Sequence, residues 1–103
     1  MELVVKNGFL IHHSQKHKCS IGFNGLSDNK LEGDGCTPTG TFKINKILYR
    51  HDKIKDVNFL LDSEIISKLD GWCDDVNSNF YNQKIIFPFN SNAEHLYRHD
   101  DLY

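Results

Sequence analysis

Apolar and polar residues alternate over short stretches of this chain, a pattern typical of β-strands. Five stretches rich in β-branched or aromatic residues are predicted strands: residues 2–6, 9–13, 18–23, 41–49 and 84–89. Asn7-Gly8 separates the first two and is a strong signal for a two-residue hairpin turn. Pro88 restricts the last predicted strand to a sheet edge or a strand end.

The segments between these strands are less regular. Residues 30–40 hold three glycines and Pro38, which predicts a shaped loop with special backbone angles. Residues 62–69 fit either one helical turn or an extended piece. Residues 70–82 are polar and aromatic with several turn signals, so we expect an ordered loop there.

One short helix is predicted near the end of the chain. Ser91 or Asn92 is a suitable N-cap, and Glu94 falls in the first turn of a helix running towards Arg98. Glu94 and Arg98 are four residues apart, a spacing that supports a helix weakly. The predicted fold class is therefore mainly β with one short helix.

Composition narrows the class of protein. The chain has 103 residues, enough for one domain, with 39% hydrophobic and 25% charged residues. The net charge is −2 and basic residues are scattered, which argues against nucleic acid as a partner. The longest apolar run, residues 85–89, is too short to cross a membrane. Residues 1–6 lack a signal-peptide pattern, so we expect a cytoplasmic chain.

Three cysteines, Cys19, Cys36 and Cys73, form no CxxC pair. This odd number argues against a disulfide framework or a zinc site and favours reduced thiols.

A series of motifs along the chain resembles one family of enzymes. In chain order the motifs are Cys19-Ser20-Ile21-Gly22, Asn24-Gly25-Leu26, Lys30-Leu31-Glu32-Gly33-Asp34-Gly35, Thr37-Pro38-Thr39-Gly40-Thr41-Phe42, Tyr49-Arg50-x-Asp52, Asp70-Gly71-Trp72-Cys73-Asp74-Asp75, Tyr81-Asn82 and Ser91-x-Ala93-Glu94-x-Leu96-Tyr97-Arg98-x-Asp100-x-Leu102-Tyr103. Together they resemble the front of YkuD-like L,D-transpeptidase domains. The Thr-Pro-x-Gly element alone is common in turns, whereas the ordered series is specific.

The resemblance implies an L,D-transpeptidase-like β-sandwich that acts on the peptide stems of peptidoglycan. The implied reaction is cysteine-dependent acyl transfer, with no cofactor, and the implied location is the cell envelope. The catalytic histidine of the family and its Ser/Thr-x-Gly-Cys motif lie downstream of the motifs found here. No residue of this chain matches them, so no catalytic residue is assigned. We expect residues 1–103 to be an incomplete front portion of one catalytic domain, inactive alone.

Carboxylates and one tryptophan are the candidate substrate-binding residues. Asp34, Asp74 and Asp75, together with Glu32, are suited to hold the ammonium group of a donor stem, but each also fits a role in forming a turn. Trp72 fits a cleft wall or a core.

Each of the three cysteines is weighed as a reactive thiol and as a residue that only packs. Cys36 lies in the glycine-rich loop, whose amides favour a thiolate, but the family has other residue types at the matching position, so a non-chemical role is the preferred interpretation. Cys73 lies beside Trp72 and two aspartates, which disfavour a thiolate, so packing is the simpler reading. Cys19 is expected in the core.

Two pairs of histidines have a spacing that suits a metal. His13 and His17 flank a predicted turn, and His95 and His99 are four residues apart on the predicted helix. No third ligand stands at a recognisable spacing, and the alternative is that all four side chains face solvent. No metal site is assigned.

Two functions therefore remain open. One is a transpeptidase, here represented by its front portion. The other is a non-enzymatic remnant or interaction module that binds a partner through an open sheet edge. An incomplete sheet also exposes edges that favour self-association.

Overall fold

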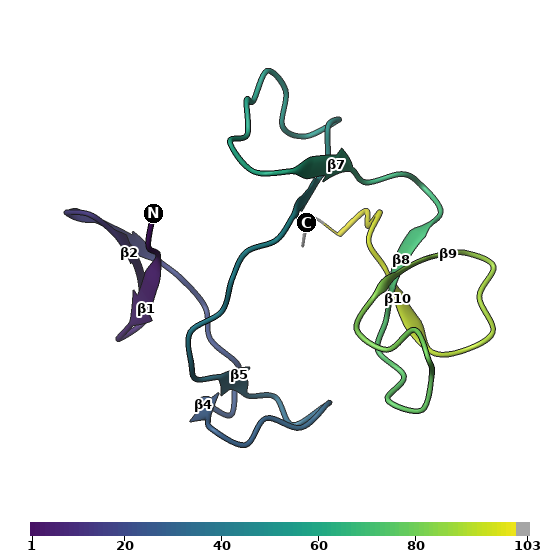
Figure 1. Ribbon diagram of the computed structural model, residues 1–103, viewed down its shortest axis with the longest axis horizontal. Coiled ribbons are helices and arrows are strands. Elements are labelled where there is room, and N and C mark those ends of the chain that lie inside the picture. Colours follow the sequence, from purple (N-terminus) through teal and green to yellow (C-terminus); the bar gives the residue numbers. More distant parts are fainter. Residues whose placement is uncertain (101–103) are drawn as a thin grey trace. The chain divides into compact units, whose positions relative to one another are not determined.

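The computed structural model describes residues 1–100, and within them the chain is mainly β, as predicted from the sequence. Ten short strands and no helix occur in these residues. The chain divides into two compact units, Met1–Thr41 and a second that begins at Phe42 (Figure 1). No helix in the described part of the chain is long and apolar enough to cross a membrane.

The first unit begins with a three-stranded antiparallel sheet. Strands β1 (Val4–Lys6), β2 (Phe9–His12) and β3 (Gln15–Lys18) lie in the order β1-β2-β3. Asn7 and Gly8 both have positive φ, 53° and 77°, which is the backbone of a type I′ hairpin turn. The predicted hairpin is therefore confirmed.

The third strand lies earlier in the chain than predicted, and the expectation of a strand at residues 18–23 was wrong. His13 adopts a φ of 53°, so the chain reverses directly after β2 and pairs again from Gln15. Only Lys18 belongs to both the predicted and the observed strand. Cys19 adds one backbone hydrogen bond to Gly8 at 3.0 Å, and the chain then leaves the sheet.

The second element of the first unit is a small parallel pair. Strand β4 (Leu26–Ser27) precedes the predicted loop of residues 30–40, and its partner β5 (Thr37–Pro38) lies within that loop. Gly33 and Gly35 have φ values of 77° and 69°, which agrees with the expectation of special backbone angles.

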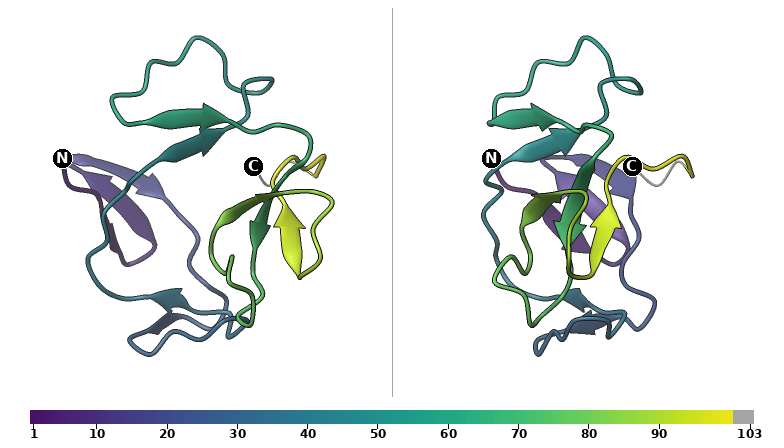
Figure 2. Two further views of the ribbon diagram at one scale, coloured as in Figure 1. Left: turned by 45° about the vertical axis from the view of Figure 1, so that its right-hand side comes forward. Right: turned by 90° about the vertical axis from the view of Figure 1, so that its right-hand side faces the viewer.

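The second unit contains a parallel pair, β6 (Ile47–Tyr49) and β7 (Ser63–Ile65). The two views in Figure 2 show this teal pair side by side. Only the last three residues of predicted strand 41–49 form a strand. Residues 62–69 take the extended alternative, because β7 pairs with β6.

A three-stranded antiparallel sheet completes the second unit. Strand β8 (Asp70–Cys73) lies between β9 (Lys84–Ile86) and β10 (Ala93–His95). Residues 70–73 were expected in a loop, and this expectation was wrong. Strand β9 ends before Pro88, as the restriction on that residue predicted.

The short helix predicted from Ser91 or Asn92 towards Arg98 was also wrong. Ala93, Glu94 and His95 pair instead with Cys73, Trp72 and Gly71 of β8. An isolated helix of two turns is unstable in water, whereas pairing with β8 satisfies the backbone groups of the same segment. Tertiary pairing therefore overrides the local capping signal.

Buried side chains in the described residues gather in the second unit. Ile66, Cys73, Ile85 and Leu96 form its apolar core. Gly71 lies among them, and a Cβ there would lie 2.8 Å from Ile85 Cδ1. The absence of a side chain at Gly71 thus lets β8 pack closely against its neighbours.

Candidate functional site

A pocket of about 560 Å³ in the second unit contains Trp72, one of the predicted substrate-binding residues. Such a volume is in the range of small-molecule sites. Its lining residues come from the segment before β6, from β6 and β7, and from the region of β8 and β9: Lys43, Ile44, Asn45, Lys46, Leu48, Glu64, Trp72, Asn82, Gln83 and Lys84.

Strand pairing creates this pocket. The register of β6 and β7 aligns Leu48 with Glu64, and the register of β8 and β9 aligns Trp72 with Lys84. An ion pair between Lys84 and Glu64 then joins the two sheets. Two separate strand pairs thus contribute to one wall.

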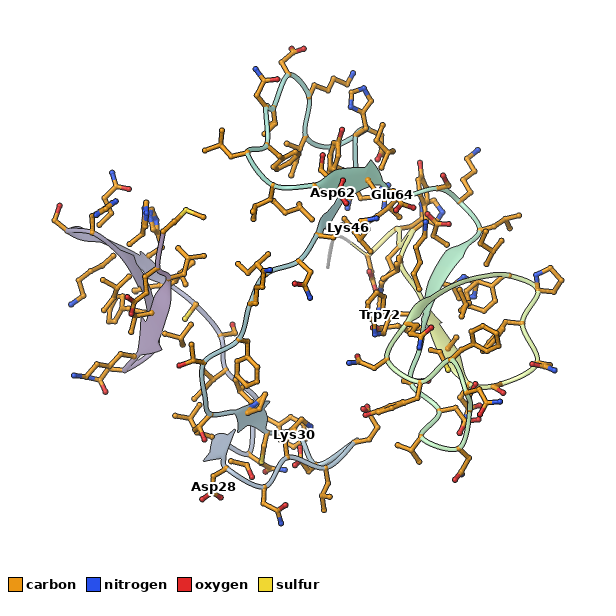
Figure 3. The ribbon with its side chains drawn as sticks, in the orientation of Figure 1. Asp28, Lys30, Lys46, Asp62, Glu64 and Trp72 are labelled. Carbon is orange, nitrogen blue, oxygen red and sulfur yellow. The ribbon has the colours of Figure 1, made fainter. Side chains whose placement is uncertain are left out.

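Glu64 lies at the centre of a charged cluster (Figure 3). Besides Lys84, its carboxylate contacts the Lys46 ammonium at 3.3 Å. Lys46 also lies 3.5 Å from Asp62, and Lys84 lies 3.4 Å from Asp70. Each lysine therefore bridges two carboxylates.

These contacts shift the proton affinities of the cluster. Hydrogen bonds from Lys84 and then Lys46 hold the pKa of Glu64 below its usual value. The same hydrogen bonds to Glu64 are the main cause of the raised pKa values of Lys46 and Lys84. These shifts favour the ionised form of Glu64 and the protonated forms of Lys46 and Lys84.

Trp72 is fixed in the pocket by a hydrogen bond. Its indole N–H donates to Asn82 Oδ1 at 3.0 Å, and Asn82 tolerates a φ of 58°. Asp74 and Asp75 follow directly after β8. Asp75 accepts the Asn77 amide at 3.0 Å, which is a turn contact, and Asp74 is exposed.

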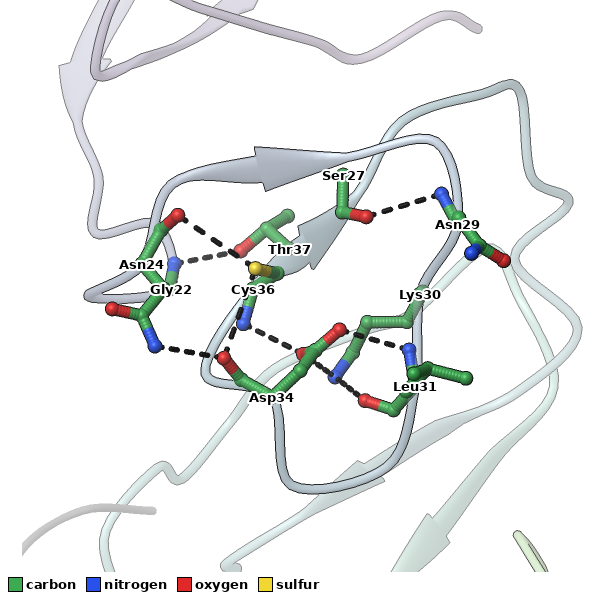
Figure 4. A network of polar contacts seen from close by, with 9 residues as sticks. All are labelled: Gly22, Asn24, Ser27, Asn29, Lys30, Leu31, Asp34, Cys36 and Thr37. Atoms are coloured by element: carbon green, nitrogen blue, oxygen red, sulfur yellow. Dashed lines mark hydrogen bonds and ion pairs between the residues drawn. The ribbon is translucent and has the colours of Figure 1, made fainter.

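Asp34 belongs to the first unit, where it organises the predicted loop (Figure 4). Its carboxylate accepts the backbone amides of Leu31 and Cys36, each at 2.8 Å, and pairs with Lys30. The hydrogen bond from Lys30, followed by those from the two amides, lowers the pKa of Asp34 to about 2. These contacts engage Asp34 in holding the loop closed.

The Cys36 thiol lies in the same loop. Its Sγ is 3.7 Å from the carbonyl oxygens of Asn24 and Asp34, so the sulfur faces acceptors. The backbone N–H of Cys36 donates a hydrogen bond to the Asp34 carboxylate. Cys73 is fully buried, in agreement with the packing interpretation, and Cys19 is half-buried.

The structure removes the helical spacing predicted for one of the two histidine pairs, His95 and His99. His95 lies in strand β10, where its ring stacks on Phe87 with centroids 4.0 Å apart. The helical spacing assumed for His95 and His99 therefore does not occur. Within residues 1–100, no group of three or more His, Cys, Asp or Glu side chains is placed to hold a metal ion.

Sequence reasoning identified Trp72 but missed the charged wall of its pocket. Lys46, Glu64 and Lys84 are distant in sequence and belong to no motif. Only the pairing of β6 with β7 and of β8 with β9 brings them together. No local sequence pattern predicts such a cluster.

Comparisons of this chain with protein-family models, with curated proteins and with solved structures found no significant match.

Proposed function

We propose that these 103 residues form the front portion of a YkuD-like L,D-transpeptidase catalytic domain, an acyltransferase that acts on peptide stems of peptidoglycan. In this proposal, the nucleophilic cysteine and its histidine come from polypeptide outside these residues. The present residues provide scaffold and substrate contacts.

Contacts between the motifs of the resemblance support the proposal. In the first unit, the Gly22 amide donates to Thr37 Oγ1 at 2.7 Å. The backbone N–H of Asn24 donates to the Gly35 carbonyl oxygen at 3.0 Å, and the side-chain Nδ2 of Asn24 donates to the Asp34 carbonyl oxygen at 2.8 Å. The motif around Gly22 thus folds directly against the Thr-Pro-x-Gly loop.

Motifs of the resemblance also contact one another in the second unit. Arg50 pairs with Asp52 and lies against the ring of Tyr97. Trp72 bonds to Asn82, and β8 pairs with β10. Motifs that are separate in the sequence are therefore the segments that contact one another, and this observation carries the proposal.

The cysteines explain why we expect no activity from residues 1–103 alone. Acyl transfer needs an accessible thiolate and a base within hydrogen-bond reach. Cys73 has no exposed surface, and Cys36 faces carbonyl oxygens. Within the described residues, no hydrogen bond joins a cysteine to a histidine.

Acyl transfer from a tetrapeptide donor to an amine acceptor tests this proposal. The assay compares the natural polypeptide, isolated from its source, with the 103-residue chain. We expect transfer by the natural polypeptide and none by the 103-residue chain. Transfer by the shorter chain, or no transfer by the natural polypeptide, would contradict the proposal.

The open edge of β1 favours a second function, binding of a partner strand. Lys6 and Phe9 flank the two-residue turn, so the next pair, Val5 and Leu10, does not exchange hydrogen bonds. The N–H and C=O of Val5 therefore face away from β2. Val5 is 52% exposed, which leaves an apolar edge.

The opposite edge of the same sheet is protected. Strand β3 carries Lys16 and Lys18, and edge lysines oppose strand addition. A partner strand, including one from a second copy of the chain, would therefore pair along β1.

Sedimentation at rising concentration tests the second function. If β1 binds a second copy, Val5→Pro abolishes association, because proline removes the outward N–H. Lys16→Pro is the matched control, since Lys16 also has an outward N–H but lies on the lysine-rich edge. A chain that stays monomeric, or equal effects of the two prolines, would argue against strand addition at β1.

A further inference from the structure

The Trp72 pocket combines a flat aromatic surface with one lysine, Lys43, that pairs with no carboxylate of the described residues. Ile44, Leu48 and Trp72 supply its apolar part. Among these, only the indole of Trp72 offers a broad flat face, and its bond to Asn82 holds that face in position. Flat rings stack on such a surface at little cost in side-chain entropy.

Lysines outnumber carboxylates in the lining itself, but Asp62 and Asp70, which lie outside the lining, balance the charge of the region. Three lysines line the pocket against one carboxylate, that of Glu64. Lys46 and Lys84 are each offset by two carboxylates, but each ammonium has three N–H donors. One donor on each therefore remains available to a bound ligand.

Lys43 is the cation that no carboxylate offsets. It is exposed at the pocket, and within residues 1–100 it forms no hydrogen bond or ion pair. The amide side chains of Asn45 and Gln83 add neutral donors and acceptors to the same lining. The polar groups thus suit one negative charge on an otherwise neutral ligand.

We propose that this pocket binds a small carboxylate whose body is a flat ring or a sugar ring. The ring lies on Trp72, and the carboxylate is held by Lys43 with help from the free N–H groups of Lys46 and Lys84. This inference invokes no acyl transfer, so it stands or fails separately from the proposed function.

Fluorescence titration of the 103-residue chain tests it, because Trp72 is the only tryptophan. The two carboxylates are phenylacetate and glucuronate, which separate an aromatic from a sugar source. Their neutral counterparts are phenylacetamide and glucose. We expect a saturable change with at least one carboxylate and none with its neutral counterpart.

Variants assign the effect to the pocket. Lys43→Gln should weaken carboxylate binding about tenfold, the effect expected from one charge-assisted contact. Lys68→Gln is the matched control, since Lys68 is an exposed lysine of the same unit outside the lining. The proposal is overturned if neither carboxylate gives a saturable change, if the neutral compounds bind equally well, or if Lys43→Gln binds as tightly as Lys68→Gln.

Discussion

The guanidinium carbon of Arg50 lies 3.7 Å from the centre of the Tyr97 ring, so a buried cation stacks on an aromatic face. Only 4% of Arg50 is exposed. Its guanidinium donates two hydrogen bonds to the Asp52 carboxylate, at 2.7 and 2.6 Å, and one to the Arg98 carbonyl oxygen, at 2.6 Å. One side chain therefore connects β6 with the segment that follows β10.

Arg50→Lys should destabilise the second unit. Lysine cannot form the planar pair of bonds to Asp52 and reach the Arg98 carbonyl together. We expect a melting temperature lower by about 5 °C or more, measured by calorimetry. Tyr97→Phe is the control, because it keeps the ring over Arg50 and removes only a 3.3 Å contact to Asp52. Equal effects of the two changes would contradict this role of the guanidinium.

Acid should weaken the chain in a defined pH range. Asp34 and Asp52 both have a pKa lowered to about 2, chiefly by hydrogen bonds from Lys30 and Arg50 respectively. Because these folded-state values lie below those of the unfolded chain, the carboxylates contribute stability that is complete above about pH 4. That contribution is lost as pH falls towards 2.

The amide proton of Cys36 reports the titration of Asp34 directly, because it donates to that carboxylate. Its NMR chemical shift should change with a midpoint near pH 2 and lose this change in Asp34→Asn. Asp28→Asn is the control, since Asp28 is exposed and outside the loop network. A midpoint near 4 would show that the loop does not hold Asp34 ionised.

Gly22→Ala should disrupt the first unit. A Cβ at Gly22 would overlap the Gly35 carbonyl oxygen and lie 2.7 Å from the Cys36 carbonyl carbon, both backbone atoms. Such overpacking costs about 3 kcal/mol of unfolding free energy. Gly8→Ala meets no atom within 4 Å but has a φ of 77°, and costs about 1 kcal/mol.

Urea denaturation followed by circular dichroism compares these two glycine variants. Trp72 fluorescence serves as the internal reference, because Trp72 belongs to the second unit. A Gly22→Ala chain as stable as Gly8→Ala would show that the two motifs do not pack closely.

Local signals predicted the local parts of the fold. The hairpin of β1 and β2 follows from Asn7-Gly8, because the turn alone sets the register. Strand β8 was missed because Asp70-Gly71 and Asp74-Asp75 resemble turns. Its burial comes from contacts with β9 and β10, which no window of sequence contains.

The candidate site was predictable only in part for the same reason. Trp72 and the carboxylates stood out by residue type, and the structure then placed Asp34 in a loop network and Trp72 in a pocket. The lysines around Glu64 depend on strand register. The helix at residues 91–98 failed because two turns are too short to resist pairing with β8.

Carbapenem labelling of the natural polypeptide tests the central claim most directly. Carbapenems acylate nucleophilic thiols, and peptide mass spectrometry locates the adduct. We predict one stoichiometric adduct on a cysteine outside residues 1–103, and none on Cys19, Cys36 or Cys73. An adduct on Cys36 or Cys73 would show that the nucleophile lies within these residues, and a natural polypeptide that forms no adduct would contradict the proposed L,D-transpeptidase function.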